Sequence, residues 1–170
     1  MSEQHDHEMR AKLESQYDKL AERFRELFES GKERTREAMD KAMERARVQL
    51  SEAGEFTAEQ GEQLKRYLKR DLEQTAQEMQ RLGHEAQERF HPDRLKAGAL
   101  SSIARIFAAA SATLQSWSRK AEEAVLCETG QVTSAGTLTC VNCGHAFQLK
   151  KTTFVPPCPG CLGTVFRKSY

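Results

Sequence analysis

The sequence predicts a mainly α-helical protein that ends in a small β domain. Its 170 residues are 30% charged, 38% hydrophobic and only 7% aromatic, which is typical of long, solvent-exposed helices. Up to residue 124, apolar residues recur at alternating steps of three and four, as they do on one face of a helix. From residue 140 the pattern changes to short β-like runs around two C-x-x-C pairs. We therefore expect a helical domain at 1–128, a hinge at 129–139 and a β domain at 140–170.

The first two helices are expected near residues 8–29 and 32–53. Glycine interrupts the helical pattern at Gly31 and again at Gly54, as it often does just beyond the end of a helix. The apolar stripe of the first helix consists of Leu13, Tyr17, Leu20, Phe24 and Leu27. The stripe of the second consists of Met39, Met43, Ala46 and Leu50. Each helix should therefore bury one face and expose the other.

A third helix is expected near residues 58–90. Thr57 and Gln60 have the spacing of a capping box, in which the threonine hydroxyl and the glutamine side chain each satisfy one free backbone N–H. The helix cannot continue unkinked through Pro92, which suits the first position of a following helix. The apolar stripe consists of Leu64, Leu68, Leu72, Met79 and Leu82.

The fourth expected helix, near residues 93–127, has the most regular stripe. Its members are Leu100, Ile103, Phe107, Ala110, Leu114, Trp117, Ala121 and Ala124. A continuous apolar stripe does not stay exposed to water. The four stripes together predict a helical bundle or an antiparallel coiled coil, and they could also join chains into a homo-oligomer.

The apolar segment 97–114 raises the question of a membrane. It is shorter than the ~20 residues that cross a bilayer, and Arg105 lies near its middle, so no transmembrane segment is expected. An amphipathic helix on a membrane surface is left open beside the core of a bundle.

Cys140, Cys143, Cys158 and Cys161 are the candidate metal ligands. Zinc prefers four thiolates in a tetrahedron, and a two-residue gap lets a tight turn direct two sulfurs at one point. We expect one Zn²⁺ per chain in a structural site, because four thiolates leave no position for a catalytic water. Two alternatives stay open. Iron is one, since rubredoxin-like turns also read C-P-x-C, and replacement of one cysteine by His145 is the other.

Other uses of paired cysteines fit less well. A thioredoxin-like redox motif has one C-x-x-C near a βαβ pattern, and this sequence has two pairs and no such pattern. Disulfides favour a secreted protein, whereas the polar segment that begins at Met1 lacks an apolar signal region, so a cytoplasmic location is expected. Cys127 lies outside the paired spacing and is expected to be a small apolar residue late in the fourth helix.

Three strands are expected around the cysteines, at 146–149, 152–155 and 164–167. Each run is rich in β-branched and aromatic residues, and Pro156 and Pro157 end the second. The segment thus predicts a three-stranded zinc ribbon, too small to fold on apolar burial alone, so that the metal supplies much of its stability. The hinge at 129–139 is inferred from a run of Gly, Ser and Thr where the helical period stops.

The chain resembles a family of uncharacterised bacterial zinc-ribbon-containing proteins. One matching region runs from Gly54 to Gln60 and on through 68–72; the other runs from Trp117 through 130–132 and 136–140 into both cysteine turns. The resemblance covers most of 54–166 and the first 50 residues only loosely. The second turn departs from the family's C-P-x-C-G, because Leu162 follows Cys161 and the glycine comes one residue later. The resemblance implies a helical N-terminal part, a C-terminal ribbon and zinc binding, and no activity.

No catalytic constellation is visible, so a non-enzymatic function is expected: a zinc-binding interaction or adaptor module. The helices would oligomerise or dock a protein partner, and the ribbon would present a rigid recognition surface. The alternative is a nucleic-acid-binding protein of the transcription or translation machinery. It is supported by the absence of Asp and Glu after Glu128, by the cations Lys150, Lys151, Arg167 and Lys168, and by the aromatic residues Phe147, Phe154, Phe166 and Tyr170. Four cations predict only weak binding to nucleic acid.

Overall fold

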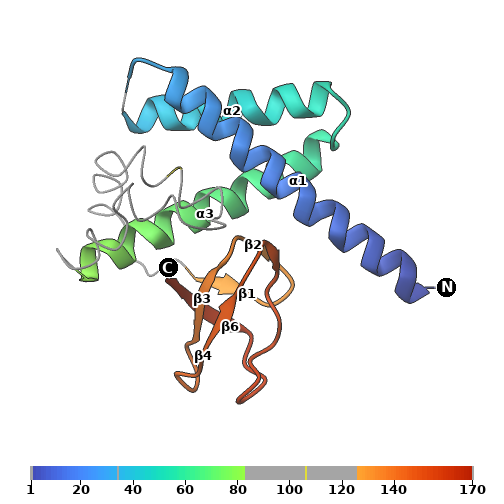
Figure 1. The fold of residues 1–170 in the computed structure, drawn as a ribbon, viewed down its shortest axis with the longest axis vertical. Coiled ribbons are helices and arrows are strands. Elements are labelled where there is room, and N and C mark those ends of the chain that lie inside the picture. The colour runs from blue at the N-terminus through green and yellow to red at the C-terminus, as the bar shows by residue number, and fades with distance from the viewer. Residues whose placement is uncertain (1, 34, 83–105, 107–125, 170) are drawn as a thin grey trace.

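The computed structural model describes residues 2–33, 35–82, 106 and 126–169. Three helices come first: α1 (Ser2–Ser30), α2 (Arg36–Glu52) and α3 (Ala58–Leu82). The strands that follow are β1 (Cys127–Glu128), β2 (Val132–Thr133), β3 (Gly136–Cys140), β4 (Ala146–Leu149), β5 (Thr153–Phe154) and β6 (Val165–Ser169). Figure 1 shows that α1 and α3 cross and that the strands lie together on one side of the crossing.

Side-chain caps fix where two of the helices begin. The backbone N–H of Ala38 donates to Oγ1 of Thr35 over 3.1 Å at the start of α2. At the start of α3, the N–H of Gln60 donates to Oγ1 of Thr57, and the N–H of Thr57 donates to Oε1 of Gln60, over 3.2 and 3.1 Å. The predicted capping box is therefore confirmed. Between these helices, Gly54 follows the end of α2 with a φ of 76°, a conformation that favours glycine.

The helices share one core, built from their predicted stripes. Tyr17, Leu20 and Phe24 of α1 are fully buried. Leu13, Leu27 and Leu50 pack against this core and are only partly buried. The other buried apolar members are Ala21, Phe28, Met39, Ala42, Met43, Ala46, Phe56, Leu64, Leu68, Leu72, Ile106 and Val132. Because Val132 belongs to β2, the core of the helices continues into the β domain.

The first three predicted helices are confirmed, with shifted ends: α1 starts earlier than residue 8, and α2 and α3 are described over 36–52 and 58–82. The expected continuation to residue 90 and the helix near 93–127 fall almost wholly outside the described residues. Within that stretch Ile106 is helical and 1% exposed. Coiled-coil pairing therefore stays a prediction.

The β domain has more strands than the three predicted. The expected runs correspond to β4, the shorter β5 and β6, but the main sheet has four antiparallel strands in the order β1-β6-β3-β4. A separate antiparallel pair joins β2 to β5. The additional strands are β1, β2 and β3, and all three precede the first cysteine turn.

Residues 129–139, predicted as a hinge, carry β2 and most of β3. Thr137 and Thr139 alternate with the buried Leu138 and Cys140, as expected for a strand with one face in the core. The run of Thr and Gly was interpreted as a linker because it lacks charge. Pairing with β4 and β6 satisfies its backbone instead.

The placement of Cys127 at the end of a helix was also wrong. Cys127 opens β1, pairs with Phe166 of β6 and is completely buried. Its thiol lies 3.6 Å from the carbonyl oxygen of Phe166. A small apolar side chain fits this position because it faces the core of the sheet.

None of the three described helices contains the long, uncharged apolar stretch that a bilayer crossing requires.

Candidate metal centre

Two turns of the same backbone form hold the four cysteines. In the first turn, the N–H of Cys140 donates to the carbonyl of His145 over 2.9 Å, and the N–H of Gly144 donates to the carbonyl of Cys140 over 3.0 Å. In the second turn, the N–H of Cys158 donates to the carbonyl of Gly163, and the N–H of Leu162 donates to the carbonyl of Cys158, both over 2.9 Å. Each C-x-x-C pair is therefore closed by the same two hydrogen bonds.

The second turn keeps this form although its sequence differs. Gly144 follows the first pair with a φ of 73°, and Leu162 takes the same left-handed conformation, with a φ of 60°. A side chain there is strained, because Cβ crowds the following carbonyl oxygen. The displaced Gly163 has a different role: a Cβ at this position would lie 3.1 Å from the sulfurs of both Cys140 and Cys161.

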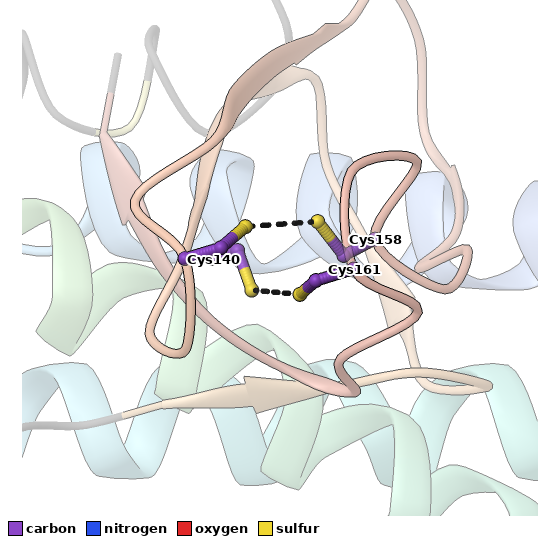
Figure 2. Close-up of side chains that lie close together, drawn as sticks. Cys140, Cys158 and Cys161 are labelled. Carbon is purple, nitrogen blue, oxygen red and sulfur yellow. Dashed lines mark hydrogen bonds between the residues drawn. The ribbon is translucent and has the colours of Figure 1, made fainter.

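The turns bring all four predicted ligands together. Their Sγ atoms lie within 4.8 Å of one another. Across the turns, the sulfurs of Cys140 and Cys161 are 3.7 Å apart, and those of Cys143 and Cys158 are 3.6 Å apart. Figure 2 shows these two approaches as dashed lines between the facing turns.

These spacings suit a metal and do not suit disulfides. Bonded sulfurs lie ~2.05 Å apart. Sulfurs at ~2.3 Å from one tetrahedral zinc lie about 3.8 Å apart, close to the separations across the turns. The donor set of four thiols also matches what zinc binds in closed, structural sites. The residues present therefore fit a tetrahedral metal ion.

Polar groups of the turns point at the sulfurs. The side-chain amide of Asn142 donates to Sγ of Cys161 over 3.4 Å, and the N–H of Gly160 donates to Sγ of Cys158 over 3.4 Å. Such donors stabilise negative charge on sulfur. Together with the N–H of Gly163, the amide of Asn142 lowers the pKa of Cys161 to about 6.

The four thiols cannot all ionise without a cation between them. The N–H of His145 lowers the pKa of Cys143, but the neighbouring thiols, Cys161 foremost, outweigh it and raise that pKa to about 12. The pKa of Cys161 is lowered and that of Cys143 is raised because negative charge on one sulfur opposes ionisation of the next. A divalent cation at their centre removes this conflict and would let all four bind as thiolates.

His145 does not join the ligand atoms. The cluster found among the described residues consists of four cysteines, so the alternative of a histidine ligand is not supported. His145 serves the first turn with its backbone, and its ring stacks near Phe147 with centroids 6.5 Å apart. Cys127 lies outside the cluster as well, as its spacing predicted.

The cluster of four cysteines on paired turns of a β domain is the defining feature of a zinc ribbon, and a family model described as a zinc-ribbon containing domain matches residues 26–169. The chain belongs to this family. The zinc-ribbon family model covers α2, α3 and every strand, so the helices are part of what the family shares. Comparisons with curated proteins and with solved structures gave no match.

The structure also shows a polar cluster that the sequence analysis missed. Lys168, counted there among the cations available to nucleic acid, is 2% exposed and lies 3.2 Å from the carboxylate of Asp71. Asp71 is on the predicted stripe-bearing helix α3, beside Leu72, and is completely buried. No local pattern could have revealed this pair, because the partners are far apart in the sequence.

Proposed function

We propose that Cys140, Cys143, Cys158 and Cys161 bind one Zn²⁺ per chain and that the protein is a non-enzymatic interaction module. The observation that supports zinc binding is the group of four sulfurs within 4.8 Å of one another. Structural zinc sites of this kind contribute roughly 10–16 kcal/mol of apparent binding free energy near pH 7. The ion would hold the two turns together in a ribbon too small to be stable without it.

Replacement of each cysteine by serine tests the zinc site. Cys140→Ser, Cys143→Ser, Cys158→Ser and Cys161→Ser should each lose most of the metal, because zinc then lacks a thiolate. Cys127→Ser is the matched control and should keep a full equivalent, since Cys127 lies in β1 outside the cluster. Metal analysis of the purified variants measures this. Full zinc content in Cys158→Ser would remove that residue from the site.

Two exposed apolar side chains on the cysteine turns support the interaction role. Val141 is 49% exposed and Leu162 is 76% exposed, and one lies on each turn. Glycine at position 162 would relieve the backbone strain that the positive φ of Leu162 imposes. An exposed leucine in this strained position suggests that its side chain contacts a partner. Apolar anchors on a rigid scaffold are typical of protein–protein interfaces.

Leu162→Gly separates binding from folding. The substitution removes the exposed side chain and keeps a residue that accepts a positive φ, so zinc content should be unchanged while partner proteins are lost. Met9→Ala is the control, because Met9 is a 51% exposed apolar residue on α1, away from the turns. Affinity capture from a lysate of the source cells, compared by mass spectrometry, measures this. If the wild type, Leu162→Gly and Met9→Ala captured the same proteins, the proposed role of the turns would be contradicted.

The nucleic-acid alternative has less support than the sequence suggested. Lys168 is buried, so three of the four counted cations remain on the surface: Lys150, Lys151 and Arg167. The ring of Phe166 is buried, and Phe147 packs edge-on against it with centroids 5.5 Å apart. The buried Phe166 ring is not available to stack on a base, and the Phe147 ring is half-buried, so the two offer less stacking surface than single-strand binding uses.

A further inference from the structure

A buried polar cluster joins the helices to the ribbon. At its centre is the carboxylate of Asp71 in α3. Tyr17 of α1 donates to it over 2.5 Å, Thr133 of β2 over 2.9 Å, and the backbone N–H of Ser134 over 3.0 Å. Lys168 of β6 completes the set with its ammonium group 3.2 Å away. Two helices, a strand of each sheet and the segment after β2 therefore meet at one carboxylate.

The ammonium group of Lys168 is held in place on the ribbon side. Besides Asp71, it donates to the hydroxyl of Thr133 over 2.8 Å and to the carbonyl oxygen and hydroxyl of Ser134 over 2.8 and 2.5 Å. The side chains of Asp71 and Lys168 are both fully enclosed. Removal of Asp71 while the two parts stay packed would leave the Lys168 ammonium group buried without its counter-charge, which is strongly unfavourable.

Arg70 adds a second cation, and its contacts with ribbon residues exist only while the ribbon is packed against the helices. The guanidinium of Arg70 lies 2.6 Å from the carboxylate of Asp71 and donates to the carbonyl of Val132 over 2.8 Å. It also donates to the side chain of Gln131. Two cations thus face one carboxylate. Oxygen atoms of the ribbon segment 131–134 accept further hydrogen bonds from the N–H groups of Arg70 and Lys168. Without the ribbon, Arg70 and Asp71 lose most of these partners.

The strand that carries Lys168 also shapes the metal centre. In β6, Phe166 pairs with Cys140, and Lys168 pairs with Leu138 on the same strand, β3. The N–H of Val141, inside the first cysteine turn, donates to the carbonyl of Val165 over 3.0 Å. One short strand is therefore fixed at one end by a cysteine turn and at the other by Asp71.

The second cysteine turn has its own connection to the helices. β5 ends four residues before Cys158, and its residue Thr153 donates to the carboxylate of Glu14 over 2.9 Å. The neighbouring Thr152 donates to Asp18 of α1 over 2.6 Å. The guanidinium of Arg10 lies 5.5 Å from the centre of the Phe154 ring. Each half of the candidate zinc site is thus continuous with a segment that touches the helices.

We propose that the cluster of Asp71, Lys168 and Thr133 couples metal binding to docking of the ribbon on the helices. Release of the metal frees the two cysteine turns, loosens β6 and β5, and uncovers the face of α1 and α3 around Tyr17 and Asp71. The inference rests on the proposed zinc site and adds regulation to it: the metal controls whether this face is covered. Coupling is reciprocal: docking raises the zinc affinity by the same factor by which zinc favours docking, so a variant that no longer docks should bind zinc more weakly.

Zinc affinity of full-length variants tests the coupling in one direction. Lys168→Met removes the ammonium group from the cluster and is expected to lower zinc affinity by about five-fold to 150-fold, the usual range of coupling between sites. Arg167→Met is the matched control: it lies next on the same strand, is exposed, and should change the affinity less than about two-fold. Competition with a chromophoric chelator gives the constants. Equal affinities of the two variants would overturn the proposal.

Hydrogen exchange of the wild-type chain tests the other direction and needs no variant. Removal of zinc by a chelator should speed exchange of the amides around Asp71 in α3 and Tyr17 in α1 as well as those of the ribbon. Faster exchange confined to the ribbon would overturn the coupling while leaving the zinc site intact. A wild-type chain that takes up no zinc would instead overturn the zinc site, so the two failures are distinguishable.

Discussion

At the scale of the residue, the structure explains why the four cysteines could be predicted and the burial of Lys168 could not. The C-x-x-C spacing describes a turn, so the sequence alone could place Cys140, Cys143, Cys158 and Cys161 around one point. The burial of Lys168 depends on Asp71, which lies in α3, 97 residues earlier in the sequence. A lysine is usually exposed, and only tertiary packing makes this one an exception.

The equivalence of Gly144 and Leu162 leads to a pair of opposite predictions. Leu162→Gly should stabilise the zinc-bound protein by about 1 kcal/mol, because a left-handed conformation disfavours a side chain by about 1–2 kcal/mol. Gly144→Leu should destabilise it by a similar amount, since nothing lies within 4 Å of a Cβ at that position and backbone strain alone decides. Urea unfolding in the presence of zinc measures both. Changes of the same sign would contradict the equivalence of the turns.

At the scale of the element, helices were easier to predict than strands. The stripes of α1, α2 and α3 repeat over many residues, and the capping box at Thr57 marks the start of α3 in the local sequence. Strands β1 and β2 have two residues each and are defined only by partners that come later in the chain. So short a run carries no period of its own, which is why these two strands were not predicted. Most of β3 was missed for another reason: it lies in the uncharged run of Thr and Gly that was interpreted as a hinge.

The packing of α3 on the turn before it gives an element-scale prediction. Alanine in place of glycine inside a helix usually stabilises by ~1 kcal/mol. At Gly61 the sign should reverse, because an added Cβ would lie 2.6 Å from the ring of Phe56 and 3.0 Å from Cγ of Arg47. We expect Gly61→Ala to destabilise by about 1–3 kcal/mol. Thermal unfolding followed at 222 nm measures this, and a smaller ring in Gly61→Ala/Phe56→Leu should recover part of the loss. Stabilisation by Gly61→Ala would contradict the close contact.

At the scale of the whole molecule, the helices and the ribbon are joined more tightly than composition suggested. The change from charged helices to a Gly- and Thr-rich segment predicted two parts separated by a hinge. That segment instead supplies Val132 to the core of the helices and Thr133 and Ser134 to the carboxylate of Asp71. Composition records which residues are polar, but it does not record which polar residues become buried together.

The charge state of Asp71 gives the last prediction. Burial alone would raise the pKa of Asp71, but Lys168 and Arg70, followed by hydrogen bonds from Tyr17 and Ser134, outweigh it and lower that pKa to about 2. A carboxyl group whose pKa is lower in the folded state stabilises the fold above its unfolded pKa of 3.8, and this contribution is lost as the pH falls from there towards 2. Between pH 6 and 8 Asp71 is therefore fully ionised, and its contribution should not vary with pH.

Asp71→Asn should consequently destabilise the zinc-bound protein by about 3–5 kcal/mol, because Lys168 and Arg70 would stay buried without a counter-charge. Urea unfolding with zinc present at pH 7 measures the loss. Asp40→Asn is the control: Asp40 lies 3.2 Å from Lys69 with both side chains well exposed, so its removal should change stability by less than about 1 kcal/mol. A loss for Asp71→Asn no larger than that of the control would mean that the buried ion pair does not hold the ribbon to the helices.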